Sequence, residues 1–108
     1  MKSKGVDINA KNNNEESPLL LAAWKGRLSI VKELIEKGAD VHSKTKRGNS
    51  PIILASREGH IDTVKFLQEN RADINAPNLD GDTPLRIARK KNHGDIERFL
   101  LSKGANDK

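Results

Sequence analysis

The chain of 108 residues contains no cysteine, and aromatic residues make up only 3% of it. Without cysteine the chain forms neither a disulfide nor a thiolate metal site. A membrane-spanning helix needs a run of about 18 apolar residues, and no apolar run in the chain approaches this length. The first residues also lack the apolar segment of a secretory signal peptide. These absences favour an intracellular protein, either cytoplasmic or nuclear.

Motifs for catalysis and for metal binding are missing as well. The chain has no glycine-rich phosphate loop, no His-Glu-x-x-His motif and no calcium-binding loop of the EF-hand type. Its three histidines, His42, His60 and His93, have no partner at helical spacing that would complete a zinc site. We therefore interpret them as turn residues and expect no enzymatic activity, no cofactor and no metal.

Positive charge exceeds negative charge in this chain. Twenty Lys and Arg residues stand against fifteen Asp and Glu residues, which gives a formal net charge of +5. Such an excess is compatible with an acidic partner. An interspersed surface charge of this size also serves solubility alone, so the composition leaves both interpretations open.

A short pattern occurs three times along the chain, at a constant step of 33 residues. Its copies begin with a hydroxyl residue, a proline and an aliphatic residue: Ser17-Pro18-Leu19, Ser50-Pro51-Ile52 and Thr83-Pro84-Leu85. The same step relates Ala22, Ala55 and Ala88, and also Leu34, Leu67 and Leu100. A fixed period of this length is typical of a stack of small units, none of which buries its apolar face alone.

The first helix of each unit is predicted from local signals. Ser17, Ser50 and Thr83 are suited to the N-cap, because a hydroxyl accepts a backbone N–H that has no partner within the helix. The proline that follows occupies the first helical position, where a missing N–H has no cost. Gly26 and its equivalent Gly59 end the first helix in a left-handed conformation. Asn92 takes this place in the third unit.

A second helix follows in each unit. Leu28, Val31 and Leu34 fall on one stripe at helical spacing. Gly38 and Gly104 end the second helix in the first and third units. Arg71 stands at the equivalent position of the second unit, where the chain is expected to leave the helix with a positive φ.

The repeated segments resemble ankyrin repeats. The opening motif is Asp80-Gly81-Asp82-Thr83-Pro84-Leu85, and Gly59-His60-Ile61 and Gly38-Ala39-Asp40-Val41 resemble the middle and the end of such a repeat. The resemblance implies an all-α repeat solenoid, in which stacked helix-turn-helix ankyrin repeats are joined by short β-hairpin loops. The hairpins rest on the resemblance alone.

The resemblance also divides the chain, which we expect to form a single ankyrin repeat domain over residues 1–108. Residues 1–13 resemble the tail and hairpin of a preceding repeat. Three repeats follow, at residues 14–46, 47–79 and 80–108. Arg86 replaces Leu20 and Ile53 of the earlier copies, so we interpret the third repeat as a C-terminal cap with a polar outer face. The uncharged run over residues 19–23 suggests an open N-terminal end, through which the chain could associate with itself.

Ankyrin repeats generally bind other proteins through their hairpin tips and the exposed side of each first helix. Mapped onto the first repeat, these positions are Lys11, Asn13, Asn14, Glu16, Trp24 and Lys25. In the second repeat they are Lys44, Lys46, Arg47, Asn49, Arg57 and Glu58. In the third repeat they are Pro77, Leu79, Asp80, Asp82, Lys90 and Lys91. Eight of these residues are basic and four are acidic.

This basic excess favours a protein partner with an acidic surface, because complementary charge raises the encounter rate. Trp24, the only tryptophan of the chain, falls on the same surface, and tryptophan is enriched among binding hot spots. Its ring could equally belong to the core. Two alternatives remain open: nucleic-acid binding through the clusters Lys44-Thr45-Lys46-Arg47 and Arg89-Lys90-Lys91, or a bare, even engineered, scaffold without an evolved ligand.

Overall fold

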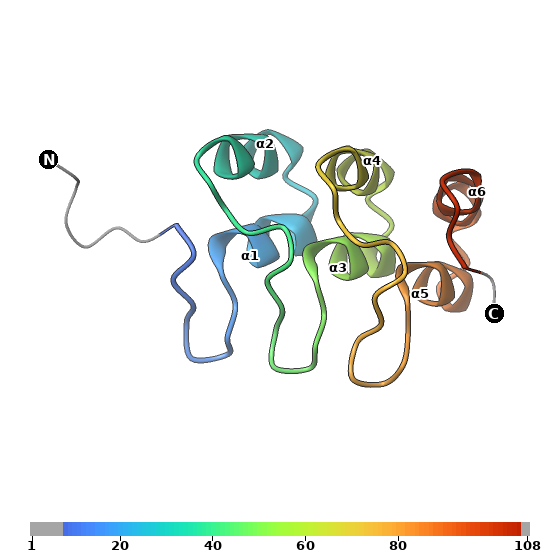
Figure 1. Ribbon diagram of the computed structural model, residues 1–108, viewed down its shortest axis with the longest axis horizontal. Helices are drawn as coiled ribbons and strands as arrows, with labels where there is room; N and C mark the ends of the chain where they lie inside the picture. The colour runs from blue at the N-terminus through green and yellow to red at the C-terminus, as the bar shows by residue number, and fades with distance from the viewer. Residues whose placement is uncertain (1–7, 107–108) are drawn as a thin grey trace, which may run out of the picture.

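The protein is an elongated stack of three helix pairs, seen in a computed structural model that describes residues 8–106 (Figure 1). The helices of these residues are α1 (Pro18–Lys25), α2 (Leu28–Glu36), α3 (Pro51–Glu58), α4 (Ile61–Glu69), α5 (Pro84–Lys90) and α6 (Gly94–Ser102). The inner row consists of α1, α3 and α5, and the outer row of α2, α4 and α6. Neighbouring helices pack within each row, and each inner helix packs on its outer partner. The expected all-α repeat stack is therefore confirmed.

The inner helices begin where the sequence predicts. The hydroxyl oxygens of Ser17, Ser50 and Thr83 accept hydrogen bonds from the backbone N–H three residues further on, at 3.2–3.3 Å. Each cap is followed by a proline inside the first turn. The helix ends are also as predicted, because Gly26, Gly59 and Asn92 adopt φ values of 69°, 83° and 62°.

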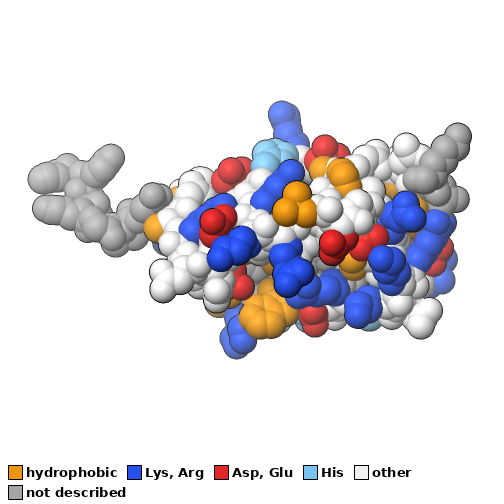
Figure 2. Space-filling view, turned by 90° about the horizontal axis from the view of Figure 1, so that it is seen from below, with side chains coloured by type: hydrophobic (Ala, Val, Ile, Leu, Met, Phe, Trp, Pro, Cys, Tyr) orange, Lys and Arg blue, Asp and Glu red, His pale blue; other side chains and the backbone are white. Residues whose placement is uncertain are grey.

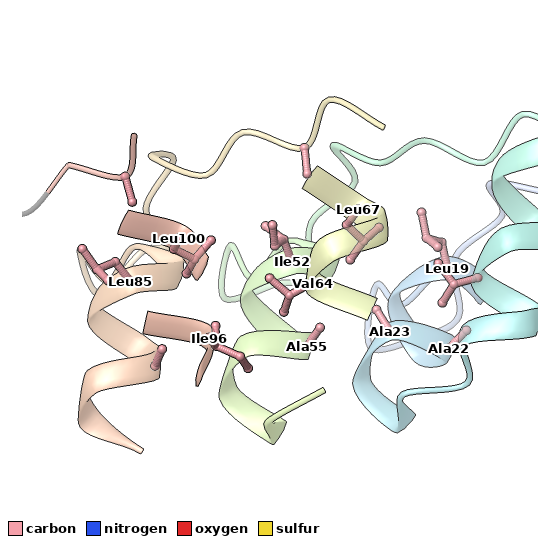
Figure 3. Close-up of a cluster of buried hydrophobic side chains, with 14 of the residues drawn as sticks. Leu19, Ala22, Ala23, Ile52, Ala55, Val64, Leu67, Leu85, Ile96 and Leu100 are labelled. Carbon is pink, nitrogen blue, oxygen red and sulfur yellow. The ribbon is translucent and has the colours of Figure 1, made fainter. Parts of the chain in front are cut away.

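The core is a thin layer between the two rows of helices, and Figure 3 shows part of it. Most of its largest side chains recur at the repeat period: Leu19, Ile52 and Leu85 from the inner row, and Val31 with Val64 and Leu67 with Leu100 from the outer row; Ile96 adds to the outer row. Ala22, Ala55 and Ala88 are buried beside them. Because alanine is small, it lets the helices approach closely, and each repeat completes the burial of its neighbour.

The C-terminal face of the stack is polar. Arg86 and Arg89 are exposed, whereas the residues at their positions in the preceding repeat, Ile53 and Ser56, are buried. The Nε atom of Arg89 lies 2.9 Å from a carboxylate oxygen of Glu97, which joins α5 to α6. The third repeat thus has arginines at positions where the second has an isoleucine and a serine, and its role as a C-terminal cap stays a prediction.

The N-terminal face differs from the expectation. Leu19, Leu20, Ala22 and Ala23 do not form an exposed apolar face, because all four are buried. The reason is that Leu20 occupies the position of Ile53 and Arg86, which faces the following repeat rather than the preceding one. Among the residues that the structure describes, the large apolar side chain exposed at this end is instead Ile30.

Three loops, called fingers below, project from the inner row on one side (Figure 1). We define finger 1 as residues 8–16, finger 2 as 39–49 and finger 3 as 72–82. Within the described residues the fingers contain no strand, so the expected β-hairpins are reduced to their turns. In each tip two backbone hydrogen bonds close the turn, as from Thr45 N to Asn49 O at 3.0 Å and from Gly48 N to Thr45 O at 2.9 Å. The last residue of each turn has a positive φ: Glu15, Gly48 and Gly81.

None of the helices in residues 8–106 is long and apolar enough to cross a membrane.

Candidate functional site

The surface expected from the sequence is a continuous face made by the fingers and the exposed side of α1, α3 and α5. We call it the finger face. Figure 2 views the molecule from the side on which the fingers project, and shows Lys and Arg side chains spread along this side with Asp and Glu side chains between them. Fingers 2 and 3 are joined directly, since Leu79 N in finger 3 donates to Arg47 O in finger 2 at 3.0 Å.

A hollow of about 300 Å³ opens on the finger face between the first two repeats. Leu20, Leu21 and Leu54 supply its apolar lining. The indole of Trp24 lines it from α1 and remains 39% exposed. An apolar hollow beside a half-exposed tryptophan is the arrangement in which burial by a partner removes much apolar surface from water.

Trp24 is held in place by its neighbours. Its backbone oxygen accepts a hydrogen bond from the imidazole Nε2 of His60 in the next repeat, at 3.0 Å. The ammonium group of Lys25 lies over the indole, 5.2 Å from the ring centroid. Trp24 is therefore neither a core residue nor a freely solvated one.

Three basic side chains also line the hollow: Lys46 and Arg47 from finger 2, and Arg57 from α3. Among the described residues, neither Lys46 nor Arg47 forms an ion pair. Arg57 donates through Nε to the carboxylate of Glu58 at 2.9 Å. The only acidic side chain of the lining is Glu16, so the hollow carries an excess of positive charge.

A family model described as "Ankyrin repeats (3 copies)" matches residues 1–78 and 19–108. The chain belongs to the ankyrin repeat family. A search of curated proteins finds no match. Ankyrin repeats generally serve as protein-binding modules and are typically not enzymes.

Seven of the residues predicted from the ankyrin resemblance are brought together at the hollow: Asn14, Glu16, Trp24, Lys46, Arg47, Asn49 and Arg57. Two predicted positions serve the fold more than the surface. Asn49 is buried and its side-chain oxygen accepts from Asn78 Nδ2 at 2.8 Å. Asp82 is buried and accepts from Lys90 Nζ through both carboxylate oxygens at 2.9 Å.

The remaining predicted residues lie elsewhere on the finger face or at its edges: Lys11, Asn13, Lys25, Lys44, Glu58, Pro77, Leu79, Asp80, Lys90 and Lys91. Leu79 stands out among them, because it is 78% exposed at the tip of finger 3. Lys11 reaches from finger 1 to finger 2 and donates to the backbone oxygen of Lys44 at 2.8 Å.

Sequence reasoning missed the apolar lining of the hollow. Leu21 and Leu54 stand one repeat apart, and Ile87 continues the series. This recurrence was the signal that could have revealed the lining, but an apolar residue that recurs in every ankyrin repeat is normally assigned to the core. Leu54 and Ile87 are indeed buried, whereas Leu21 stays partly exposed.

Two of the three histidines, His60 and His93, join neighbouring repeats. The imidazole of His60 lies against Gly26, and that of His93 lies against Gly59. His93 Nε2 lies 3.1 Å from the backbone oxygen of Arg57, as His60 does from that of Trp24. Within residues 8–106 no group of three His, Cys, Asp or Glu side chains could hold a metal ion.

Proposed function

We propose that the protein is a non-enzymatic interaction module that binds a protein partner with an acidic surface on its finger face. The observation that carries the proposal is the hollow between the first two repeats, where the half-exposed Trp24 lies beside the basic residues Lys46, Arg47 and Arg57. A buried aromatic anchor with complementary charge around it is the usual composition of a binding hot spot.

The distribution of ion pairs supports an acidic rather than a basic partner. On the finger face, the carboxylates of Glu58 and Asp82 are already paired with Arg57 and Lys90. Lys46 and Arg47 have no such partner among the described residues. An approaching acidic protein therefore gains attraction at unpaired cations, which raises the association rate at low salt. We place this activity in the cytoplasm or nucleus, in keeping with the lack of cysteine.

A triple variant tests the surface: Trp24→Ala with Arg47→Glu and Arg57→Glu. We expect it to lose binding to a captured partner protein by about a hundredfold or more, since it removes a hot spot and reverses two charges. Circular dichroism checks that its helices are intact. The matched control is Lys32→Glu with Lys65→Glu on the outer helices α2 and α4, which reverses the same number of charges away from the finger face. A partner that binds the triple variant unchanged contradicts the proposal.

A DNA-binding measurement on the wild-type protein tests the alternative of nucleic-acid binding. Binding to mixed-sequence single-stranded DNA that is independent of sequence and falls steeply with salt would indicate phosphate contacts. Base stacking along a strand needs a row of aromatic side chains, and Trp24 is the only aromatic residue lining the hollow. We expect saturable protein binding that is lost with Trp24.

A further inference from the structure

The second and third repeats carry a basic residue at the same repeat position, but they differ in the acceptor beside it. In the third repeat, Lys90 donates to both carboxylate oxygens of Asp82 at 2.9 Å, and Arg86 Nε lies 3.9 Å from one of them. The equivalent residues of the second repeat, one step of 33 earlier, are Arg57 and Asn49. Because asparagine carries no charge, Arg57 has no counterpart of the Asp82 carboxylate.

Arg57 is consequently only partly satisfied. Its Nε donates to Glu58 at 2.9 Å, and a guanidinium group has further N–H donors. Its side chain is 34% exposed and lines the hollow together with Arg47 and Trp24. A guanidinium fork matches a carboxylate in two parallel hydrogen bonds, which is the strongest pairing open to it.

We propose that the hollow takes one apolar side chain from an extended acidic segment of the partner, and that a carboxylate beside this side chain pairs with Arg57 and Arg47. This inference rests on the proposed function. The hollow of about 300 Å³ is at the lower end of ligand pockets, which span roughly 300–1,000 Å³. It has room for one bulky side chain of the partner.

The apolar lining and the charges select the partner's chemistry. Of the apolar lining, Leu21 and Trp24 keep exposed surface whereas Leu20 and Leu54 are buried, so an aliphatic or aromatic side chain of the partner would remove that surface from water. A basic segment is disfavoured by Lys46, Arg47 and Arg57 at the same place, because like charges at an interface weaken binding. Asn49 sets this preference indirectly, since it leaves Arg57 without an internal carboxylate.

The substitution Asn49→Asp tests this effect, and Arg57→Gln tests it without a new charge in the hollow. An aspartate oxygen still accepts the hydrogen bond from Asn78 Nδ2, now 2.8 Å from Asn49 Oδ1. By the repeat relationship, the new carboxylate pairs with Arg57 as Asp82 pairs with Lys90. Trp24 and the leucines of the lining stay as they are, but Arg57 is no longer available to the partner, and the new carboxylate adds a negative charge to the hollow.

The experiment is a selection of peptides from a random displayed library on the immobilised full chain, followed by calorimetric titration of the enriched peptides. We expect enriched peptides to carry Asp or Glu next to a bulky apolar residue. Asn49→Asp should weaken their binding about tenfold or more, the loss of a charge-assisted pair. Gln68→Glu on α4 adds the same charge on the outer row and should leave affinity unchanged. If Asn49→Asp fails to fold, Arg57→Gln should give the same loss.

Two results would overturn the inference. One is an enriched set without acidic residues beside the apolar one. The other is equal affinity for the wild type and Asn49→Asp, or for the wild type and Arg57→Gln. If the enriched peptides nevertheless fail to bind the triple variant, the finger face is the binding surface. The proposed function then stands without this role for the hollow. If the triple variant also binds them unchanged, both proposals fail.

Discussion

The imidazole Nε2 of His60 lies 3.0 Å from the backbone oxygen of Trp24, and the same ring covers Gly26. One repeat later, His93 contacts the backbone oxygen of Arg57 and covers Gly59. Carbonyl groups near a helix end have no partner inside the helix, so these bonds satisfy groups that would otherwise need water. They also fix the backbone of Trp24 and Arg57, two residues that line the hollow.

The first prediction concerns the space that His60 occupies. A Cβ atom added at Gly26 would lie 2.5 Å from the His60 ring, at a φ of 69°. Gly38 also has a positive φ, of 96°, but no atom lies within 4 Å of its added Cβ. We expect Gly38→Ala to reduce the free energy of unfolding by about 1 kcal/mol, and Gly26→Ala by about 1–3 kcal/mol more. Urea denaturation of both variants measures this. Equal losses would show that His60 moves aside without cost.

The helix boundaries could be predicted from the sequence because their signals are local. A cap such as Ser50 acts on the N–H of Ile53, three residues away, and a left-handed glycine acts on its own turn. The repeat period then determines which helices stack. The burial of Leu20 could not be predicted in the same way. It depends on which side of α1 faces the following repeat, and this is a property of the stack.

The hollow could not be predicted from the sequence either, for a similar reason. The residues that line it come from two fingers and two helices, and their approach depends on contacts between repeats. One example is the side chain of Asn9, whose oxygen accepts from Asp40 N at 2.8 Å, across 31 residues. Asn75 makes the equivalent contact with Asn106 N at 2.7 Å. His42 holds this position between them, so the three fingers are not tied to the stack in the same manner.

The second prediction concerns Arg71, which has a φ of 74° at the position of Gly38 and Gly104. A side chain in this conformation costs about 1 kcal/mol relative to glycine. Arg71→Gly should therefore raise the urea midpoint, although glycine gives the unfolded chain more freedom. Arg71→Ala is the control and should change stability little, because it keeps a Cβ at the same φ. A lower midpoint for Arg71→Gly would mean that the arginine makes a stabilising contact.

The third prediction concerns Ser56, which is fully buried in α3 and whose hydroxyl oxygen has no hydrogen-bond partner among residues 8–106. Its equivalent in the first repeat, Ala23, is equally buried. Ser56→Ala should raise the free energy of unfolding by about 1 kcal/mol, because it removes an unsatisfied polar group from the core.

Ser50→Ala is the matched comparison for this change. Ser50 caps the same helix and accepts from Ile53 N at 3.3 Å, so its loss should destabilise by about 1 kcal/mol. The two serine-to-alanine substitutions should thus change the free energy of unfolding in opposite directions, as measured by thermal or urea unfolding. A destabilised Ser56→Ala would mean that the hydroxyl group has a partner in solution, such as a buried water.

The last prediction concerns the N-terminal end of the stack. Ile30 is 41% exposed, whereas its equivalents Thr63 and Ile96 are 1% and 0% exposed because a preceding repeat covers them. An apolar side chain left uncovered in this way favours self-association. We expect sedimentation to show weak dimers at rising protein concentration. In the monomer, the amides of the first repeat should exchange faster than those of the second, since within residues 8–106 the first has a neighbouring helix pair on one side alone.

Two lysine substitutions locate the contact. Ile30→Lys should remove the association and keep the fold, because this side chain is not part of the buried core. Leu101→Lys is the control, since Leu101 is 40% exposed on α6 near the opposite end of the stack, and it should leave the association unchanged. If the wild type stays monomeric at every concentration and its first repeat is as protected as its second, the end is already closed and Ile30 has no role in assembly. If both variants still dimerise, the contact lies on another face.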